Sequence, residues 1–181
     1  MTIDLRDATL SVEAVRAALG LAPHPEGGAF REIWRDAPED GGRGAATSIH
    51  FLLGAGERSH WHRVDAAELW LWQAGAPLLL EIHGEASQHP SLRAERSNPP
   101  PGQASASIAA SPSAPRHGGA TIEQIRLGPD LGARESFQAV VPKGAWQAAE
   151  SLGTWTLVSC VVAPAFEFSG FELAPPGWAP R

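Results

Sequence analysis

The stretch GAGERSHWHRVDAAELWLWQAG, residues 54–75, decides the fold. His60 and His62 stand two apart in an extended run, and side chains two apart on a strand project from one face, so we expect both imidazoles on the same face. Glu68 follows after five intervening residues and begins a second extended run. If the two runs pair as a hairpin, the face with Glu68 meets the face with the imidazoles. The pattern therefore predicts two histidines and a carboxylate side by side on a β-scaffold.

Two imidazoles and one carboxylate on one side of a metal ion form the facial arrangement of non-haem iron sites, and the same groups suit zinc, manganese or nickel. A site built from several cysteines is excluded, because Cys160 is the chain's one cysteine. The alternative is a histidine pair without a ligand, since His-x-His is common by chance. We therefore predict a divalent transition metal (Fe, Zn, Mn or Ni) as an optional cofactor only.

Outward from this stretch, period-two alternation recurs over short runs separated by Gly, Pro or Asp. Before them, residues 11–19 have helical spacing, with Ser11 placed to cap the start and Gly20 to end the helix. Many short strands with one short N-terminal helix favour an antiparallel sandwich or small barrel over βαβ units. The predicted fold class is therefore all-β in its core. The expected strands cover residues 30–34, 47–53, 60–64, 68–73, 78–83, 122–127, 137–141, 146–149 and 155–162.

Composition indicates a single folded unit. The chain has 181 residues, of which 43% are hydrophobic, and this suits one domain over residues 1–181. Residues 86–120 include eight Ala, seven Ser and six Pro, so they offer too little apolar surface to offset the entropy of ordering. We expect a flexible loop within the domain, with an active-site lid as the alternative.

Charge and hydropathy exclude several partners. The formal net charge is −6 and the chain has one lysine, Lys143, which argues against a surface that tracks nucleic-acid phosphates. No apolar run approaches the ~18 residues of a membrane helix, and the N-terminus carries charges where a signal peptide is apolar. We expect a cytoplasmic protein that binds a small molecule, with no nucleic-acid or membrane partner.

A second informative stretch is ESFQAVVPKGAWQAAES, residues 135–151. Pro142 and Gly144 predict a tight turn between two strands. By alternation Gln138 and Gln147 can point inward, where a buried amide needs hydrogen-bond partners and can contact a ligand. A purely structural amide is the alternative at both positions.

These motifs resemble a known family. The spacing Gly54-x5-His60-x-His62-x5-Glu68-x6-Gly75 resembles the first cupin motif, and Pro142-x-Gly144-x2-Gln147 resembles the second. The phrases at 24–34, 59–70, 137–149 and 160–173 are similar to a small branch of RmlC-like cupins catalogued as a domain of unknown function. The resemblance spans about residues 17–173, apart from the expected loop.

The resemblance implies a cupin jelly-roll barrel, a homodimer, and a pocket in the barrel mouth that both motifs build. It also implies that the metal ligands, where a metal binds, are His60, His62, Glu68 and Gln147. Two departures weaken such a site. Five residues separate His62 from Glu68, where most metal-binding cupins have three or four, and Gln147 stands where they have a third histidine. Because a carboxamide binds transition metals less well than an imidazole, we expect weak metal binding.

The function that the resemblance implies is a metal-independent sugar or keto-acid isomerase or epimerase. His62 would be the general base, and Glu68 would fix its tautomer and raise its basicity. The ligand would contact Arg63, Trp70, Gln138, Trp146 and Gln147. The related nucleotide-sugar epimerases use a tyrosine as the acid, and this chain has no tyrosine.

Two other functions stay open. One is a non-catalytic cupin that binds a small ligand or a weakly held metal, since fold does not fix function. The other is an Fe(II) dioxygenase, which the substitution at Gln147 disfavours. Near the N-terminus, His24 is expected to shape a turn, with Glu26 and Glu32 within reach of the pocket. Cys160 is expected to be an inert buried thiol.

Overall fold

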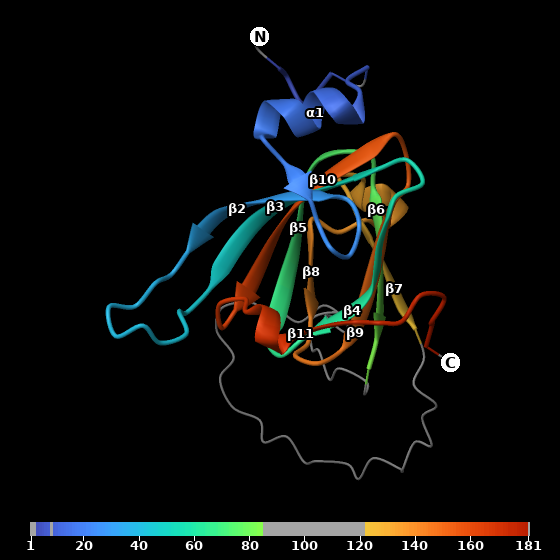
Figure 1. Ribbon diagram of the computed structural model, residues 1–181. Helices are drawn as coiled ribbons and strands as arrows, with labels where there is room; N and C mark the ends of the chain where they lie inside the picture. Colours follow the sequence, from blue (N-terminus) through green and yellow to red (C-terminus); the bar gives the residue numbers. More distant parts are fainter. Residues whose placement is uncertain (1–2, 8, 85–121, 181) are drawn as a thin grey trace, which may run out of the picture.

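Two antiparallel sheets pack face to face, with a short helix at one end of them (Figure 1). The computed structural model describes residues 3–7, 9–84 and 122–180. This architecture confirms the predicted all-β core with a short N-terminal helix. The loop predicted over 86–120 lies outside the described residues. Within the described part of the chain, no helix is long and apolar enough to cross a membrane.

The larger sheet has six strands in the order β1-β2-β3-β10-β5-β8, and the smaller has five in the order β11-β4-β9-β6-β7. From β3 to β6 the chain changes sheet at every strand, which is how a jelly roll places consecutive strands on opposite walls. The larger sheet contains β1 (Ala22–Pro23), β2 (Ala29–Arg35), β3 (Thr47–Gly54), β5 (Ala67–Gly75), β8 (Gln138–Val141) and β10 (Trp155–Ala163). The smaller contains β4 (Arg58–Val64), β6 (Leu78–His83), β7 (Glu123–Leu127), β9 (Trp146–Ser151) and β11 (Phe171–Leu173).

The helix α1 (Val12–Leu19) begins and ends as its sequence predicts. The Ser11 hydroxyl accepts a hydrogen bond from the backbone N–H of Ala14, and Gly20 ends the helix in the left-handed conformation. Val15 is fully buried in a small cluster with Trp155 and neighbouring apolar side chains. The helix thereby closes the end of the barrel away from the polar residues described below. Two short 3₁₀ turns, η2 (Leu131–Ala133) and η3 (Phe168–Gly170), complete the described helical elements.

The main core fills the space between the sheets with every second side chain of the facing strands. Phe51, Trp70, Leu80 and Val158 are each at most 1% exposed. Phe51 and Trp70 meet edge to face with ring centroids 5.8 Å apart, a favoured aromatic geometry. On strands of both sheets, side chains that point inward alternate with side chains that point outward. This alternation is the physical reason that the apolar pattern of the sequence predicts the strands.

Strand β4 carries an irregularity that determines which of its side chains point into the barrel. Ser59 pairs with Ala149 of β9, whereas His62 pairs with Gln147, so three steps along β4 match two along β9. One extra residue therefore stands between Ser59 and His62, as in a β-bulge. Ser59 and His62 are both buried, at 0% and 2% exposure, although they stand three positions apart and regular alternation would place them on opposite faces.

Candidate functional site

A cavity of about 80 Å³ is lined by residues of both sheets. Five phenylalanines form much of its wall: Phe30, Phe51, Phe166, Phe168 and Phe171. Its polar and titratable lining residues are His24, Glu26, Glu32, Arg35, Thr47, His62, Glu68 and Cys160. His62 and Glu68, which the sequence predicts as the catalytic pair, therefore face one cavity.

A wider and more open groove of about 810 Å³ lies beside the N-terminal segment, lined by residues that include Leu19, His50, Trp72 and Trp155. None of the predicted site residues lines it. The groups with the largest pKa shifts, His24, Glu26 and Glu68, all line the smaller cavity, so we take that cavity as the candidate site.

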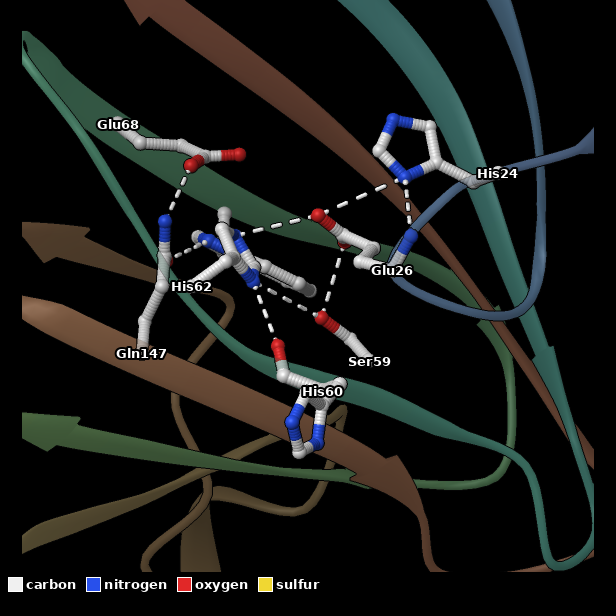
Figure 2. A network of polar contacts seen from close by, with 8 residues as sticks. His24, Glu26, Ser59, His60, His62, Glu68 and Gln147 are labelled. Carbon is white, nitrogen blue, oxygen red and sulfur yellow. Dashed lines mark hydrogen bonds and ion pairs between the residues drawn. The ribbon is translucent and has the colours of Figure 1, made fainter. Parts of the chain in front are cut away.

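The bulge in β4 separates the two histidines of the His-x-His motif. His62 points inward, whereas the Nε2 of His60 lies 3.2 Å from the backbone oxygen of Pro175, in the segment after β11. Figure 2 shows the His60 ring turned away from the rest of the network. The expectation that both imidazoles share one face is therefore wrong. Alternation assumes regular pairing, and the extra residue rotates His60 out of phase with His62.

His62 is held as a neutral imidazole with one nitrogen free to act. Its Nδ1 lies 2.8 Å from the backbone oxygen of His60 and 3.5 Å from the Ser59 hydroxyl. A backbone carbonyl only accepts, so Nδ1 carries the proton and Nε2 keeps its lone pair. Burial lowers the pKa of His62, while the charge of Glu68 and the hydrogen bond to the His60 carbonyl oppose this shift. The Nε2 atom lies 3.3 Å from Oε2 of Glu26.

Glu26 reaches the cavity from the turn between β1 and β2. The turn sits directly against β4, because the backbone N–H of His60 donates to the Glu26 carbonyl at 2.8 Å. A Cβ on Gly27, whose φ is +109°, would lie 2.3 Å from the Arg58 carbonyl oxygen, so only glycine permits this approach. The Ser59 hydroxyl donates to Oε1 of Glu26 at 2.9 Å. Burial raises the pKa of Glu26 to about 8, although the hydrogen bond from Ser59 lowers it.

His24 lies on the other side of Glu26 (Figure 2). Its Nδ1 accepts the backbone N–H of Glu26 at 3.4 Å and is 3.5 Å from Oε2 of the same residue. Phe30 packs edge-on against the ring with a centroid distance of 4.5 Å. Burial, and then the nearby His62, lower the pKa of His24 to about 4, so this imidazole is neutral at pH 7.

Glu68 is tied to the second motif through Gln147. The Gln147 amide donates to Oε2 of Glu68 at 2.5 Å and accepts the indole N–H of Trp70 at 2.8 Å. Burial raises the pKa of Glu68 to about 7; His62 when protonated and the amide of Gln147 act against the shift, and Glu26 adds to it. Cys160 lines the same cavity, and burial raises the pKa of its thiol well above the usual range.

Three predicted ligand contacts lie outside the cavity. Arg63 follows the inward His62 and therefore points outward, where it pairs with Glu172 and lies 4.8 Å from the centroid of the Trp146 ring. Trp146 likewise precedes the inward Gln147, and it stacks on Trp178 with centroids 4.5 Å apart. Gln138 is exposed at the start of β8. Alternation thus places Arg63, Trp146 and Gln138 on outer surfaces, whereas Trp70 and Gln147 belong to the buried network.

The predicted metal ligands do not form a metal site. His60 faces away, and Gln147 uses its carbonyl oxygen to bind Trp70 and presents its amide nitrogen to Glu68. An amide nitrogen that donates a hydrogen bond has no lone pair to offer a metal ion. Over residues 3–7, 9–84 and 122–180, no group of three or more His, Cys, Asp and Glu side chains is arranged to hold a metal. The residues present therefore do not fit the transition metal that the cupin resemblance implies.

Sequence reasoning gave little weight to His24 and Glu26, and it missed Ser59. All three stand beside His62, yet they come from a turn and from the residue before the His-x-His motif. The available signal was the phrase HPEGG at residues 24–28, in which two glycines follow a carboxylate. Paired glycines after Glu26 indicate a turn that approaches another segment closely, and such a turn can bring a carboxylate into a buried site.

The comparisons with known proteins agree with this architecture. A family model described as "Cupin superfamily (DUF985)" matches residues 13–174. A hypothetical protein from Leishmania major is 28% identical with a TM-score of 0.69, over 91% of this chain and 88% of its own. A protein from Shewanella oneidensis is 29% identical with a TM-score of 0.69, over 92% of this chain and 85% of its own.

A more distant solved structure shows the fold alone. Oxalate decarboxylase from Bacillus subtilis is 14% identical with a TM-score of 0.51, over 83% of this chain and 29% of its own. No functionally curated protein matches the chain at a significant level. The family match over most of the chain, with the two-sheet architecture and the two motifs, confirms the resemblance seen in the sequence: the chain belongs to the cupin superfamily, in the branch described as DUF985.

Proposed function

We propose that this chain is a metal-independent isomerase or epimerase that moves a proton at the carbon next to the carbonyl group of a small sugar-like or keto-acid compound. One observation carries the proposal. The neutral imidazole of His62 is anchored through Nδ1 to a backbone carbonyl at 2.8 Å, and its free Nε2 faces a buried carboxyl group 3.3 Å away. A fixed base beside a fixed acid is the arrangement that general acid–base catalysis needs.

His62 is the base in this proposal. Its Nε2 lone pair accepts the proton from the substrate carbon, and the imidazolium that forms lies near Glu68. The charge of Glu68 favours the protonated form of His62, so it stabilises this state. General base catalysis by one positioned side chain contributes roughly 10²- to 10⁴-fold to a rate.

Glu26 takes the place of the acid that the missing tyrosine would supply. Its pKa of about 8 keeps the carboxyl protonated at pH 7, so it donates that proton to the carbonyl oxygen as His62 removes the proton from carbon. The step leaves a Glu26 carboxylate and a His62 imidazolium, and its product is a neutral enediol from an α-hydroxycarbonyl compound or an enol from a keto acid. For an enediol, transfer of the His62 proton to the former carbonyl carbon, and of the proton of the original α-hydroxyl to Glu26, completes an isomerisation and restores both groups.

The size of the cavity supports a small substrate. About 80 Å³ is far below the ~300 to 1,000 Å³ of pockets that enclose drug-sized ligands. A short sugar or keto acid suits this volume, and a longer ligand would place only its reactive end inside. The phenylalanine wall also lowers the polarity around the two charges formed during the step, which strengthens their interaction.

A second candidate function is non-catalytic binding of a small ligand. The observation that favours it is that several buried polar groups already satisfy one another, as Ser59 does with Glu26 and Gln147 does with Glu68 and Trp70. A buried polar network whose groups hydrogen-bond one another can serve to hold a rigid structure as well as to support catalysis. The third possibility, an Fe(II) dioxygenase, loses support because His60 and Gln147 are not available as ligands.

Exchange of the substrate's α-proton with solvent deuterium tests the proposal before the physiological substrate is known. Protein treated with EDTA is incubated in D₂O with glyceraldehyde, dihydroxyacetone, erythrose or pyruvate, and loss of the α-proton signal is followed by ¹H NMR. We expect exchange for at least one compound, and its loss in His62→Gln. The matched control is His50→Gln, since His50 lies on β3 outside the cavity lining. Exchange that persists in His62→Gln would overturn the proposal, and ligand binding without exchange would favour the second candidate.

A further inference from the structure

The two histidines beside Glu26 hold opposite tautomers. His24 receives a backbone N–H at Nδ1, and an N–H can only donate, so the lone pair is on Nδ1 and the proton is on Nε2. His62 faces a backbone carbonyl at Nδ1 and so has the reverse arrangement. The pKa of about 4 for His24 agrees with this assignment, because a neutral ring carries one N–H only. His24 therefore carries its donor, Nε2–H, on the ring edge away from Glu26, whereas His62 presents an acceptor, Nε2, to Glu26.

The His24 ring is fixed in place, and its donor is unused. Three aromatic rings surround it edge-on, with centroids at 4.5 Å for Phe30, 5.7 Å for Phe51 and 6.4 Å for Phe171. Its side chain is 8% exposed and lines the cavity. Among the hydrogen bonds within the described part of the chain, none engages its Nε2. An N–H without a protein partner, on a ring that lines the cavity, indicates a position for a ligand acceptor.

The described lining of the cavity offers an anionic ligand no permanent cation that is free of protein partners. Three carboxyl groups line it, those of Glu26, Glu32 and Glu68. Of the described lining residues, Arg35 is the one permanent cation, and its guanidinium is held by Glu32 at 2.7 Å and by the Phe166 carbonyl at 2.9 Å. A buried carboxylate without an opposite charge is costly, so a keto acid would be disfavoured beside these groups.

We infer that the cavity takes a neutral α-hydroxycarbonyl compound, such as a short aldose or ketose, and that the Nε2–H of His24 binds the hydroxyl oxygen next to the carbonyl. This inference rests on the proposed function and narrows its substrate from two classes to one. Glu26 donates to the carbonyl oxygen, while His24 recognises the adjacent hydroxyl. A site that donates to a substrate hydroxyl discriminates strongly against analogues that lack it, because the buried donor is then left unpaired.

NMR of protein labelled with ¹⁵N-histidine tests the tautomers and the ligand class without any turnover. At pH 7 we expect an Nε2–H signal for His24 and an Nδ1–H signal for His62. Addition of dihydroxyacetone should shift the His24 signal, whereas acetone, which lacks the hydroxyl, and pyruvate, which carries a carboxylate, should not. Equal shifts with pyruvate, an Nδ1–H tautomer of His24, or no shift with dihydroxyacetone would each overturn the inference.

His24→Phe removes the donor and keeps a ring among the phenylalanines. Loss of one neutral hydrogen bond should weaken dihydroxyacetone binding by about tenfold and leave acetone binding unchanged. His24→Gln keeps an N–H donor and should recover part of the affinity. Selective shifts without deuterium exchange would refute the proposed chemistry and leave this binding site standing. Deuterium exchange with pyruvate and with none of the hydroxycarbonyl compounds would support the proposed chemistry and refute this inference.

Discussion

Replacement of Glu26 by glutamine is expected to change how the protein's stability depends on pH. The Glu26 side chain is 7% exposed, and burial raises its pKa from 4.5 to about 8. Between these two pH values the folded protein keeps a proton that the unfolded chain has released. The free energy of unfolding of the wild type therefore falls as pH rises through this window. Glutamine does not ionise, so the variant escapes this loss.

The structure sets the size of the effect. A shift of one pKa unit corresponds to about 1.4 kcal/mol. From 4.5 to about 8 the loss sums to about 5 kcal/mol for Glu26 titrating alone. Between pH 5.5 and pH 7.5 the variant should therefore gain about 3 kcal/mol relative to the wild type. Glu68 adds in the same direction, because Glu26 is one cause of its raised pKa.

Urea unfolding at pH 5.5, 6.5 and 7.5 measures this difference. Glutamine can keep the hydrogen bond from Ser59, so its pH-independent cost should be small compared with the slope. Glu39→Gln gives the baseline, since Glu39 is exposed in the β2–β3 connection. Wild-type and Glu26→Gln stabilities that run parallel across the three pH values would refute the reasoning. Glu26 would then be ionised in the folded protein, and it could not serve as the acid at pH 7.

Three further predictions concern the same network. Replacement of His24 by phenylalanine should change stability at acid pH. The pKa of His24 drops from 6.5 to about 4 on folding, so the free energy of unfolding of the wild type falls as pH decreases through that window. His24→Phe has no such group and should gain stability relative to the wild type there. The full shift corresponds to about 3 kcal/mol, and solvent in the cavity reduces the expected gain to about 2 kcal/mol, measurable by urea unfolding at pH 4.5 and 7. Gln147→Leu should cost roughly 1 to 3 kcal/mol by the same assay, because it leaves the buried indole N–H of Trp70 unpaired, and a cost below about 0.5 kcal/mol would contradict that role. Finally, Zn²⁺ or EDTA should move the thermal midpoint by less than about 1 °C, and a larger rise with Zn²⁺ that His62→Gln abolishes would show a metal site after all.

The fold was predictable because burial on the strands repeats every two residues. Phe51 and Leu53, for example, stand two apart in the sequence and both point into the core. The helix was predictable because Ser11 and Gly20 mark its ends. Both signals are local, so they can be read without knowing which strands pair.

The arrangement of the histidines was not predictable in the same way. Whether His60 shares a face with His62 depends on how β4 pairs with β9, and the residue types in β4 do not reveal that register. One extra residue in β4 exchanges His60 for Ser59 on the inner face. The exchange replaces a metal ligand by a hydroxyl that donates to Glu26, so a shift of one residue changes the chemistry of the site.

Glu26 was also hard to weigh from sequence, because its importance comes from a long-range contact. The turn that carries it docks on β4, about thirty residues later, through the bond from the His60 N–H to the Glu26 carbonyl. Glu68 could be placed because it begins a strand whose alternation is visible. The part of the site on regular strands was therefore recoverable, and the part on the turn was not.

The same burial that supplies an acid also opposes a metal. Metal ligands must be deprotonated, whereas Glu26 and Glu68, with pKa values of about 8 and about 7, hold protons wholly or in part at neutral pH. A metal that bound here would first have to release them, so its affinity would rise with pH by up to about tenfold per unit for each displaced proton. A proton-transfer enzyme needs the opposite arrangement, an acid that keeps its proton until the substrate arrives. Raised carboxyl pKa values around a neutral imidazole therefore favour proton chemistry over metal chemistry in this cavity.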